Sequence, residues 1–201
     1  MTRTLAALFL AGAWLAPAAT YDIDPAHSSA QFTVKHLMIT NVHGQFSKVT
    51  GSLEFNDSNP AAASVKAVID ASTINTQEPK RDEHLKSPDF LDTAKFPTIT
   101  FQSASFHKVE SGKYKVTGDL SIHGVTKRVT LDVDGPTAEV KDPMGNTRIA
   151  ISGTTKINRS EFGLTWNKAL ESGGVLVGDE VNITLEVEFI KKNAAVSQAR
   201  N

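Results

Sequence analysis

Six histidines and one arginine–histidine pair are the side chains of this sequence that are best suited to chemistry. The histidines are His27, His36, His43, His84, His107 and His123. No two of them lie two to five residues apart, which is the spacing of local metal-ligand motifs. His43 and His123 each precede a glycine, a pattern that favours turns. We therefore predict no metal site and expect these histidines to cap turns or face solvent.

Arg81 and His84 are three residues apart, so they share one face of any helix that contains them. An arginine and a histidine on one face could receive an anionic head group. Alternatively, Arg81 pairs with Asp82, Asp89 or Asp92 and fastens the helix to the rest of the fold, which is the more frequent role of such residues. We predict that Arg81 and His84 form a polar mouth, with structural pairing as the alternative.

Common catalytic motifs are missing from the sequence. The nucleophile elbow G-x-S-x-G, the phosphate loop G-x-x-x-x-G-K-[ST] and the zinc motif H-E-x-x-H do not occur. The absence of cysteine excludes disulfides, thiolate zinc sites and thiol nucleophiles. We therefore expect a protein that is not an enzyme and needs no cofactor.

Composition narrows the class of protein further. The chain has 201 residues, 40% of them hydrophobic and 21% charged, and a formal net charge of -1. This length and composition suit one globular domain. A nucleic-acid-binding protein would normally be basic or carry a basic stripe, so we expect no nucleic-acid partner.

The elements that must position these residues are mainly strands, because apolar and polar residues alternate after residue 20. The clearest run is 181–189, in which Val, Ile, Leu and Phe alternate with Asn, Thr and Glu. The same pattern predicts about eight strands, over residues 30–35, 45–55, 64–71, 98–106, 114–122, 125–133, 149–157 and 181–189. His123 and Gly124 separate two of these runs, as in a tight hairpin turn.

Residues 77–93 depart from the strand pattern. Pro79 suits the first turn of a helix, and Pro88 must interrupt it. We predict one short helix over residues 79–86, followed by a turn around residues 89–94. The glycine-rich stretch 171–178 lacks phosphate-binding spacing, and we predict a flexible loop there, near the mouth of a barrel.

The first residues predict export. Arg3 is followed by an apolar run over residues 5–15, and Ala16-Pro17-Ala18 fits a small-x-small cleavage site. The run is too short for the ~30 Å hydrocarbon core of a bilayer. We predict a signal peptide over residues 1–18 (a cut after Ala19 is the alternative), a domain over 19–193 and a disordered tail over 194–201. The mature protein is then periplasmic, or else secreted.

An all-β chain of this kind folds either as a sandwich or as a barrel, and periodicity does not separate the two. Eight strands is the number at which a barrel interior either just fills with side chains or holds one small ligand. We predict an eight-stranded antiparallel lipocalin-like barrel with one short helical segment between strands. Closure leaves no free edge for pairing, so a homodimer would form through other faces.

An ordered set of motifs runs from Tyr21 to Lys192, which is nearly the whole mature chain. It begins with Tyr21-x-Ile23-Asp24-x-x-His27-Ser28, Phe32-x-Val34-x-His36 and Val42-x-Gly44-x-Phe46. The most specific stretch is Arg81-Asp82-x-His84-Leu85-x-Ser87-x-Asp89-Phe90-Leu91-Asp92, followed by Phe96-Pro97 and Phe101. It continues with Val116-x-Gly118-Asp119-Leu120-x-Ile122-His123-Gly124-Val125-Thr126, Arg159-x-x-Phe162-Gly163 and Gly178-Asp179-Glu180-Val181.

With these motifs the chain resembles the YceI-like family of periplasmic polyisoprenoid-binding proteins. The resemblance implies an elongated barrel whose lumen holds the tail of an isoprenoid lipid, such as a quinone or a polyprenyl phosphate. Leu91 departs from the pattern, since a second Phe is frequent at this position, but the substitution remains apolar. A carrier of this kind needs no catalytic residue, in agreement with the missing motifs.

Strand alternation predicts which apolar residues line the lumen. The predicted ligand-binding residues are Phe32, Val34, Phe101, Leu120, Ile122, Val129, Leu131, Ile151, Ile183 and Leu185, with Arg81 and His84 at the mouth. Some of these side chains must pack the barrel ends or the helix, so we expect about half to contact ligand.

Two other functional classes remain open from the sequence. One is an enzyme or accessory subunit in quinone or isoprenoid metabolism. The other is a structural or stress-response β-sandwich without ligand, in which the same apolar residues would fill the core.

Overall fold

The computed structural model describes residues 18–171 and 173–192. The predicted signal peptide, apart from Ala18, and the predicted tail lie outside these residues. Within the described residues, eight strands close into an antiparallel barrel. In order around the barrel they are β1 (Ala19–Ile23), β4 (Val49–Phe55), β5 (Ser64–Asp70), β7 (Thr98–Glu110), β8 (Lys113–Ile122), β9 (Val125–Asp134), β11 (Thr147–Asn158) and β12 (Val177–Lys191). Pairing of β12 with both β11 and β1 closes the ring.

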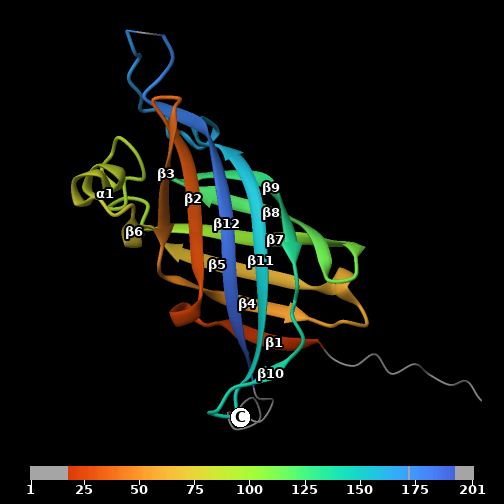
Figure 1. Cartoon of the computed structure of the whole chain (residues 1–201). Coiled ribbons are helices and arrows are strands. Elements are labelled where there is room, and N and C mark those ends of the chain that lie inside the picture. Colours follow the sequence, from red (N-terminus) through yellow and green to blue (C-terminus); the bar gives the residue numbers. More distant parts are fainter. Residues whose placement is uncertain (1–17, 172, 193–201) are drawn as a thin grey trace, which may run out of the picture.

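A hairpin of β2 (Ser29–His36) and β3 (Thr40–Phe46) extends the barrel wall at one end. Strand β12 is 15 residues long, or roughly 50 Å. Its last residues pair with β1, and its earlier part, from Glu186 back to Val177, pairs with β2. Strands β2, β3, β11 and β12 therefore run together along the molecule, and β4, β5, β7 and β8 cross them (Figure 1).

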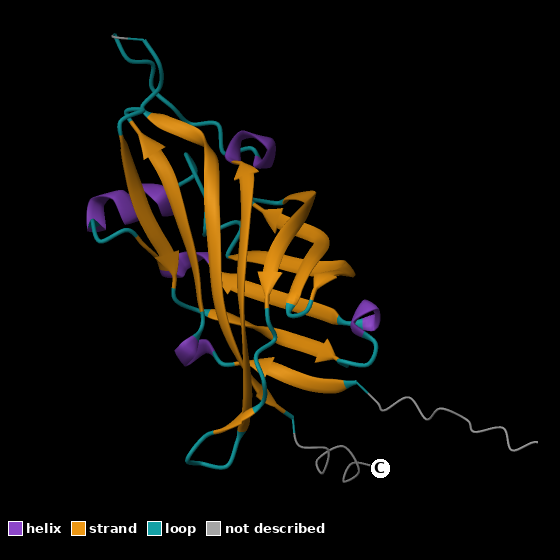
Figure 2. Ribbon diagram, turned by 45° about the vertical axis from the view of Figure 1, so that its right-hand side comes forward, coloured by secondary structure: helices purple, strands orange, loops and turns teal. Residues whose placement is uncertain are grey.

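The remaining elements are short and connect the strands or cap them. They are η1 (Pro25–His27), η2 (Pro60–Ala62), η3 (Ala71–Thr73), η4 (Arg159–Phe162), α1 (Pro79–Lys86), and the two-residue strands β6 (Ile74–Asn75) and β10 (Val140–Lys141). Figure 2 shows these helical turns on the outside of the barrel. None of the helices described is long and apolar enough to cross a membrane.

The predicted helix over residues 79–86 is confirmed with the same bounds. Pro79 stands in its first turn, and the Glu78 carboxylate accepts a hydrogen bond from the backbone N–H of Lys80 as a cap. Turns follow over residues 88–91 and 93–95. The hairpin turn at His123 and Gly124 is also confirmed, with φ angles of 52° and 76° at these two positions.

The predicted single strand over residues 45–55 is wrong, because the structure divides it into β3 and β4 with a break at residues 47 and 48. Phe46 and Val49 are both buried. They are three residues apart, so in one continuous strand they would face opposite sides of the sheet. The break lets both side chains point into the barrel. Strand β1 is absent from the predicted strands. It has only five residues, and its two inward positions, Tyr21 and Ile23, are too few for an alternating pattern to predict a strand.

Candidate ligand-binding cavity

The barrel encloses a cavity of about 410 Å³, a volume within the usual range for small-molecule sites. Its walls come from the inward-facing residues of the strands, and β8 shows the rule most clearly. Every second residue from Tyr114 to Ile122 is buried, and the residues between them are exposed or half-buried. All of these inward residues except Gly118 line the cavity. Alternation along the strands thus produces an apolar interior.

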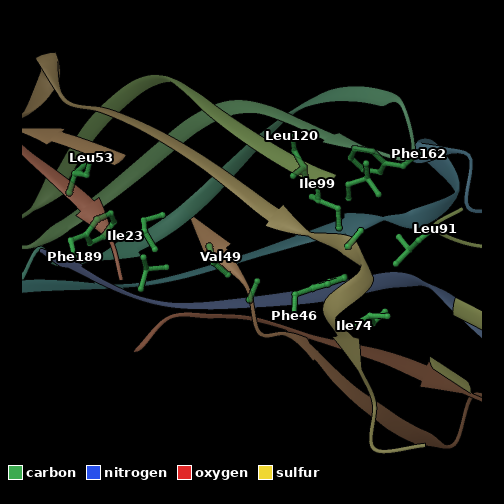
Figure 3. Close-up of a cluster of buried hydrophobic side chains, with 14 of the residues drawn as sticks. Ile23, Phe46, Val49, Leu53, Ile74, Leu91, Ile99, Leu120, Phe162 and Phe189 are labelled. Carbon is green, nitrogen blue, oxygen red and sulfur yellow. The ribbon is translucent and has the colours of Figure 1, made fainter. Parts of the chain in front are cut away.

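One end of the cavity is closed by packed side chains. Phe189 is fully buried, Leu53 is 2% exposed, and Ile23 lies beside them (Figure 3). These residues come from β12, β4 and β1, and β1 pairs with both of the other strands at this end. The lumen therefore ends in a dense apolar floor.

The other end carries the partly exposed and polar residues of the cavity wall. Lys35, His36, Arg81, His84 and Trp166 all line the cavity there, and none of them is buried. They come from the end of β2, from α1 and from the segment after η4. The mouth of the cavity therefore lies between α1 and the β2–β3 hairpin.

All twelve predicted site residues lie on the wall of this cavity. They are Phe32, Val34, Arg81, His84, Phe101, Leu120, Ile122, Val129, Leu131, Ile151, Ile183 and Leu185. The structure therefore brings together residues from β2, α1, β7, β8, β9, β11 and β12. Their contact with a ligand stays a prediction.

Sequence reasoning missed further lining residues of two kinds. Val116, Val133 and Val187 lie on predicted strands, an even number of residues from predicted positions, so the same alternation could have found them. Leu91 reaches the cavity from a turn, and Trp166 reaches it from the irregular segment after η4. No periodic signal marks such residues.

Arg81 is held at the mouth by Thr76. Its Nε donates to Thr76 Oγ1 at 2.7 Å, and its Nη2 donates to the Thr76 carbonyl oxygen at 2.8 Å. Asp82 accepts hydrogen bonds from the same hydroxyl and from the Thr76 backbone N–H. Arg81 is therefore fastened through a buried threonine rather than through the carboxylate pairing considered as the alternative.

His84 joins α1 to the turn that follows it and to the segment after η4. Its Nε2 lies 2.9 Å from Asp89 Oδ2. Its ring meets those of Phe90 and Trp166 edge to face, with centroids 5.1 and 4.9 Å away. These contacts fix one nitrogen of His84 on Asp89 and make the ring part of an aromatic rim.

Arg159 is a buried cation that fixes the chain at the mouth. Its Nε donates to the carbonyl oxygen of Gly178 at 3.0 Å, and its Nη1 donates to those of Leu164 and Trp166. Its Nη2 also lies 3.0 Å from the Asp179 carboxylate. Burial lowers the pKa of Arg159, and Asp179 opposes this effect. The guanidinium thus donates the hydrogen bonds that the carbonyl groups of this irregular segment would receive from backbone N–H groups in a regular sheet.

A second charged cluster lies outside the closed end. The guanidinium of Arg148 contacts Asp24 at 2.6 Å, Asp142 at 2.7 Å and also Glu188. The Arg148 and His27 hydrogen bonds lower the pKa of Asp24 to about 2. Asp24, His27 and Glu188 are close enough to share a metal ion, but Nη1 of Arg148 already contacts the carboxylates of both Asp24 and Glu188, and its positive charge opposes a cation at this place. We therefore assign this cluster a structural role.

The fold and its cavity define a class of protein, a closed β-barrel with an apolar internal binding space. The model of the YceI-like domain matches residues 21–189. The chain therefore belongs to the YceI-like family.

Known proteins support this assignment. A UPF0312 protein of Staphylococcus aureus is 39% identical over 171 residues, covering 84% of this chain and 96% of the relative. The crystal structure of the Campylobacter jejuni YceI protein has a TM-score of 0.66 and 32% identity, covering 79% of this chain and 90% of that one.

More distant structures share the fold. Burkholderia cenocepacia BcnA has a TM-score of 0.70 and 23% identity, covering 83% of this chain and 98% of that one. A polyisoprenoid binding domain from Saccharophagus degradans, implicated in plant cell wall breakdown, has a TM-score of 0.61 and 15% identity. This match covers 87% of the present chain and 99% of the domain.

Proposed function

We propose that this protein binds an isoprenoid lipid, of the quinone or polyprenyl phosphate type, and carries or sequesters it in the barrel lumen. The observation that carries the proposal is the cavity itself, which is apolar along its depth and polar at its mouth. Among the described residues, every buried side-chain nitrogen or oxygen atom has a hydrogen-bond partner. The residues that line the lumen are predominantly apolar, so the lumen favours an apolar tail.

Burial of the tail supplies the driving force. Each Å² of apolar surface removed from water contributes about 25 cal/mol, and a polyprenyl tail exposes such surface along its whole length. The lumen removes it on all sides at once. The solved domain described as polyisoprenoid-binding has the same fold, which supports this class of ligand here.

The head group would remain at the mouth, near Arg81 and His84. Both side chains line the cavity there without being buried. A guanidinium can donate several hydrogen bonds to a phosphate or to a quinone oxygen. These two residues would therefore set the position of the head group, while the strands accept any sufficiently long tail.

We also propose that the mature protein acts in the periplasm. The support is the sequence of residues 1–18, with its basic start, apolar run and small-x-small end. N-terminal sequencing of the protein recovered from a periplasmic fraction tests this directly. A first residue of Ala19 or Thr20 is expected, and a retained Met1 in a cytoplasmic fraction would contradict export.

The function is tested by expressing the full chain in a bacterium, purifying the exported protein without detergent and extracting it for mass spectrometry. The expected result is one isoprenoid lipid per protein molecule. If the extract of folded protein is empty and the protein takes up neither ubiquinone nor undecaprenyl phosphate, the proposal is wrong.

Binding without turnover is the expected mode of action. The same preparation, incubated with the lipid it releases, should return that lipid unchanged. A chemical conversion of the lipid that disappears in His84→Ala would instead favour the enzyme class.

A further inference from the structure

The tip of the β2–β3 hairpin, residues 37–39, exposes apolar side chains next to the mouth of the cavity. Met38 is 52% exposed and Ile39 is 73% exposed. Six large hydrophobic residues are exposed among the described residues, and these two are consecutive. Figure 1 shows the tip at the end of β2 and β3, and the segment that precedes β12 lies beside it and projects farther in the same direction. The tip therefore exposes two apolar side chains at this end of the molecule, next to the base of the projecting segment.

The backbone of this tip is unusual for its residue types. Leu37 has a φ of 50° and Met38 a φ of 62°, and the Ile39 N–H donates to the His36 carbonyl oxygen at 3.1 Å. Tight turns with positive φ normally use Asn and Gly, because larger side chains are strained there. Turn formation alone does not explain a Leu-Met-Ile tip. Strain of this kind gathers at functional positions.

Contacts with the segment before β12 support the tip. The Leu37 N–H donates to the Leu176 carbonyl oxygen at 2.8 Å, and the Leu176 N–H donates to the Lys168 carbonyl oxygen at 2.9 Å. Gly174 lies against Met38, since a Cβ on Gly174 would stand 3.6 Å from Met38 Cγ. The segment before β12 therefore holds the hairpin tip in place through one backbone hydrogen bond and one side-chain contact.

The tip and the mouth are continuous. Lys35, His36 and Leu176 line the cavity, and His36 precedes Met38 by only two residues in the sequence. An interfacial side chain enters a membrane by about 5–10 Å. Insertion of Met38 and Ile39 to that depth would bring the mouth of the cavity to the level of the lipid head groups.

Charges around the tip fit an anionic surface. Lys35 and Lys168 are exposed beside it, and the backbone of Lys168 is fixed there because its carbonyl oxygen accepts a hydrogen bond from the Leu176 N–H. Glu171 is the acidic residue that follows Lys168 in the same segment. Basic side chains close to a membrane surface are attracted by its anionic lipids.

We propose that the hairpin tip, Leu37-Met38-Ile39, docks on the surface of a lipid bilayer and aligns the cavity mouth with it for exchange of the lipid. This inference rests on the proposed function, because a protein without a lipid ligand has no need of such an alignment. The partner is the bilayer itself, with Lys35 and Lys168 favouring anionic head groups.

The test measures sedimentation of the protein with vesicles of phosphatidylcholine that contain phosphatidylglycerol, and transfer of ubiquinone from the same vesicles. The double variant Met38→Ser/Ile39→Ser should lose at least about tenfold in both, because two apolar side chains no longer enter the membrane. Met144→Ser is the matched control. Met144 is 86% exposed in the hairpin between β10 and β11, at the opposite end of the long strands, and its loss should change neither value.

Uptake of ubiquinone from a cyclodextrin solution separates the two proposals. The double variant should take up ubiquinone from cyclodextrin as the wild type does, because its cavity is unchanged. If the wild type takes up none from either source, the proposed function fails. If the double variant equals the wild type on vesicles, docking through the tip is wrong. A dimer in the wild type that the double variant dissociates, without an effect on vesicles, would assign the tip to self-association instead.

A labelled variant gives an independent reading of depth. The chain contains no cysteine, so Met38→Cys carries a single environment-sensitive dye, with Met144→Cys as control. The dye at residue 38 should report an apolar environment on addition of the anionic vesicles, and the dye at residue 144 should not. Equal responses at both positions would overturn the proposal.

Discussion

The ring of Phe32 fills the space that a side chain on Gly44 would occupy. The two residues face each other across β2 and β3, and a Cβ on Gly44 would stand 2.3 Å from Cζ of Phe32. The three atoms nearest to that position all belong to the Phe32 ring. The absence of a side chain at residue 44 therefore keeps this ring against the wall and leaves the lumen open beside it.

Gly44→Ala should push the Phe32 ring into the lumen and reduce the uptake of lipid several-fold. Overpacking of this kind also costs about 1–3 kcal/mol of folding free energy. Uptake is measured by titration with ubiquinone, and stability by chemical unfolding. Gly153→Ala is the matched control on the same wall, since its Cβ would find its nearest neighbour at an ordinary 3.5 Å.

A second substitution should reverse the effect. Phe32→Leu in the Gly44→Ala background removes the displaced ring, so uptake should return toward the wild-type value. If Gly44→Ala binds lipid as the wild type does, the ring does not border the ligand space.

Ile183→Trp distinguishes an open lumen from a filled core. Ile183 lies on β12, lines the cavity and is only half-buried. In an open lumen the larger ring enters empty space, so the melting temperature should stay within a few degrees while lipid uptake falls at least about tenfold. In a filled core the same change would destabilise the fold by about 1–3 kcal/mol or more. Thermal unfolding and lipid titration of one preparation decide between the two.

The strand faces could be predicted because one physical rule governs them. A strand with one face in the lumen and one in water must alternate, and β8 does so from Tyr114 to Ile122. The same rule placed Leu131 of β9 and Leu185 of β12 on the cavity wall. The helix over residues 79–86 was equally accessible, because Pro79 and Pro88 limit it from both sides.

Other features depend on contacts that no local pattern records. The break between β3 and β4 follows from the need to bury both Phe46 and Val49. Trp166 reaches the mouth because Arg159 binds the backbone around it, and β2 shares an edge of β12 with β1 through long-range pairing. Each of these features depends on how side chains and strands pack in three dimensions, so alternation alone could not predict them.

Protonation of Asp24 should weaken the closed end of the barrel. The folded-state pKa of Asp24 is about 2, below its ordinary value of 3.8, so ionised Asp24 stabilises the fold above about pH 4. This contribution is lost as the pH falls from about 4 to 2. Asp24→Asn should therefore lower the free energy of unfolding at pH 7 by about 1–3 kcal/mol. The free energy of unfolding of the variant should also decrease less steeply than that of the wild type between about pH 4 and 2.

Chemical unfolding between pH 7 and 2 measures this effect. Asp22→Asn is the control, because Asp22 is exposed and pairs with Lys192 at the surface, where such pairs contribute about 0–1 kcal/mol. An Asp24→Asn curve parallel to that of the wild type would show that the Arg148 cluster does not stabilise the closed end through this carboxylate.

Arg159→Met should loosen the mouth of the cavity more than its floor. The substitution leaves the carbonyl groups of Leu164, Trp166 and Gly178 without their donors, and each buried carbonyl without a partner costs about 1–3 kcal/mol. Hydrogen exchange should accelerate in residues 164–171 and 173–178, while β1 and β4 keep their protection. Arg128→Met is the control, since Arg128 forms an exposed pair with Asp119.

Lysine should not replace Arg159, because its single ammonium group lacks the planar fork that reaches several carbonyls at once. Arg159→Lys is therefore expected to show the same local acceleration of exchange, reduced in extent. Because Arg159→Lys keeps the positive charge, this variant separates the ion pair with Asp179 from the hydrogen bonds to the carbonyl groups. Wild-type exchange in Arg159→Lys would mean that the cation and its contact with Asp179 hold the segment, and that the hydrogen bonds to the carbonyl groups contribute little.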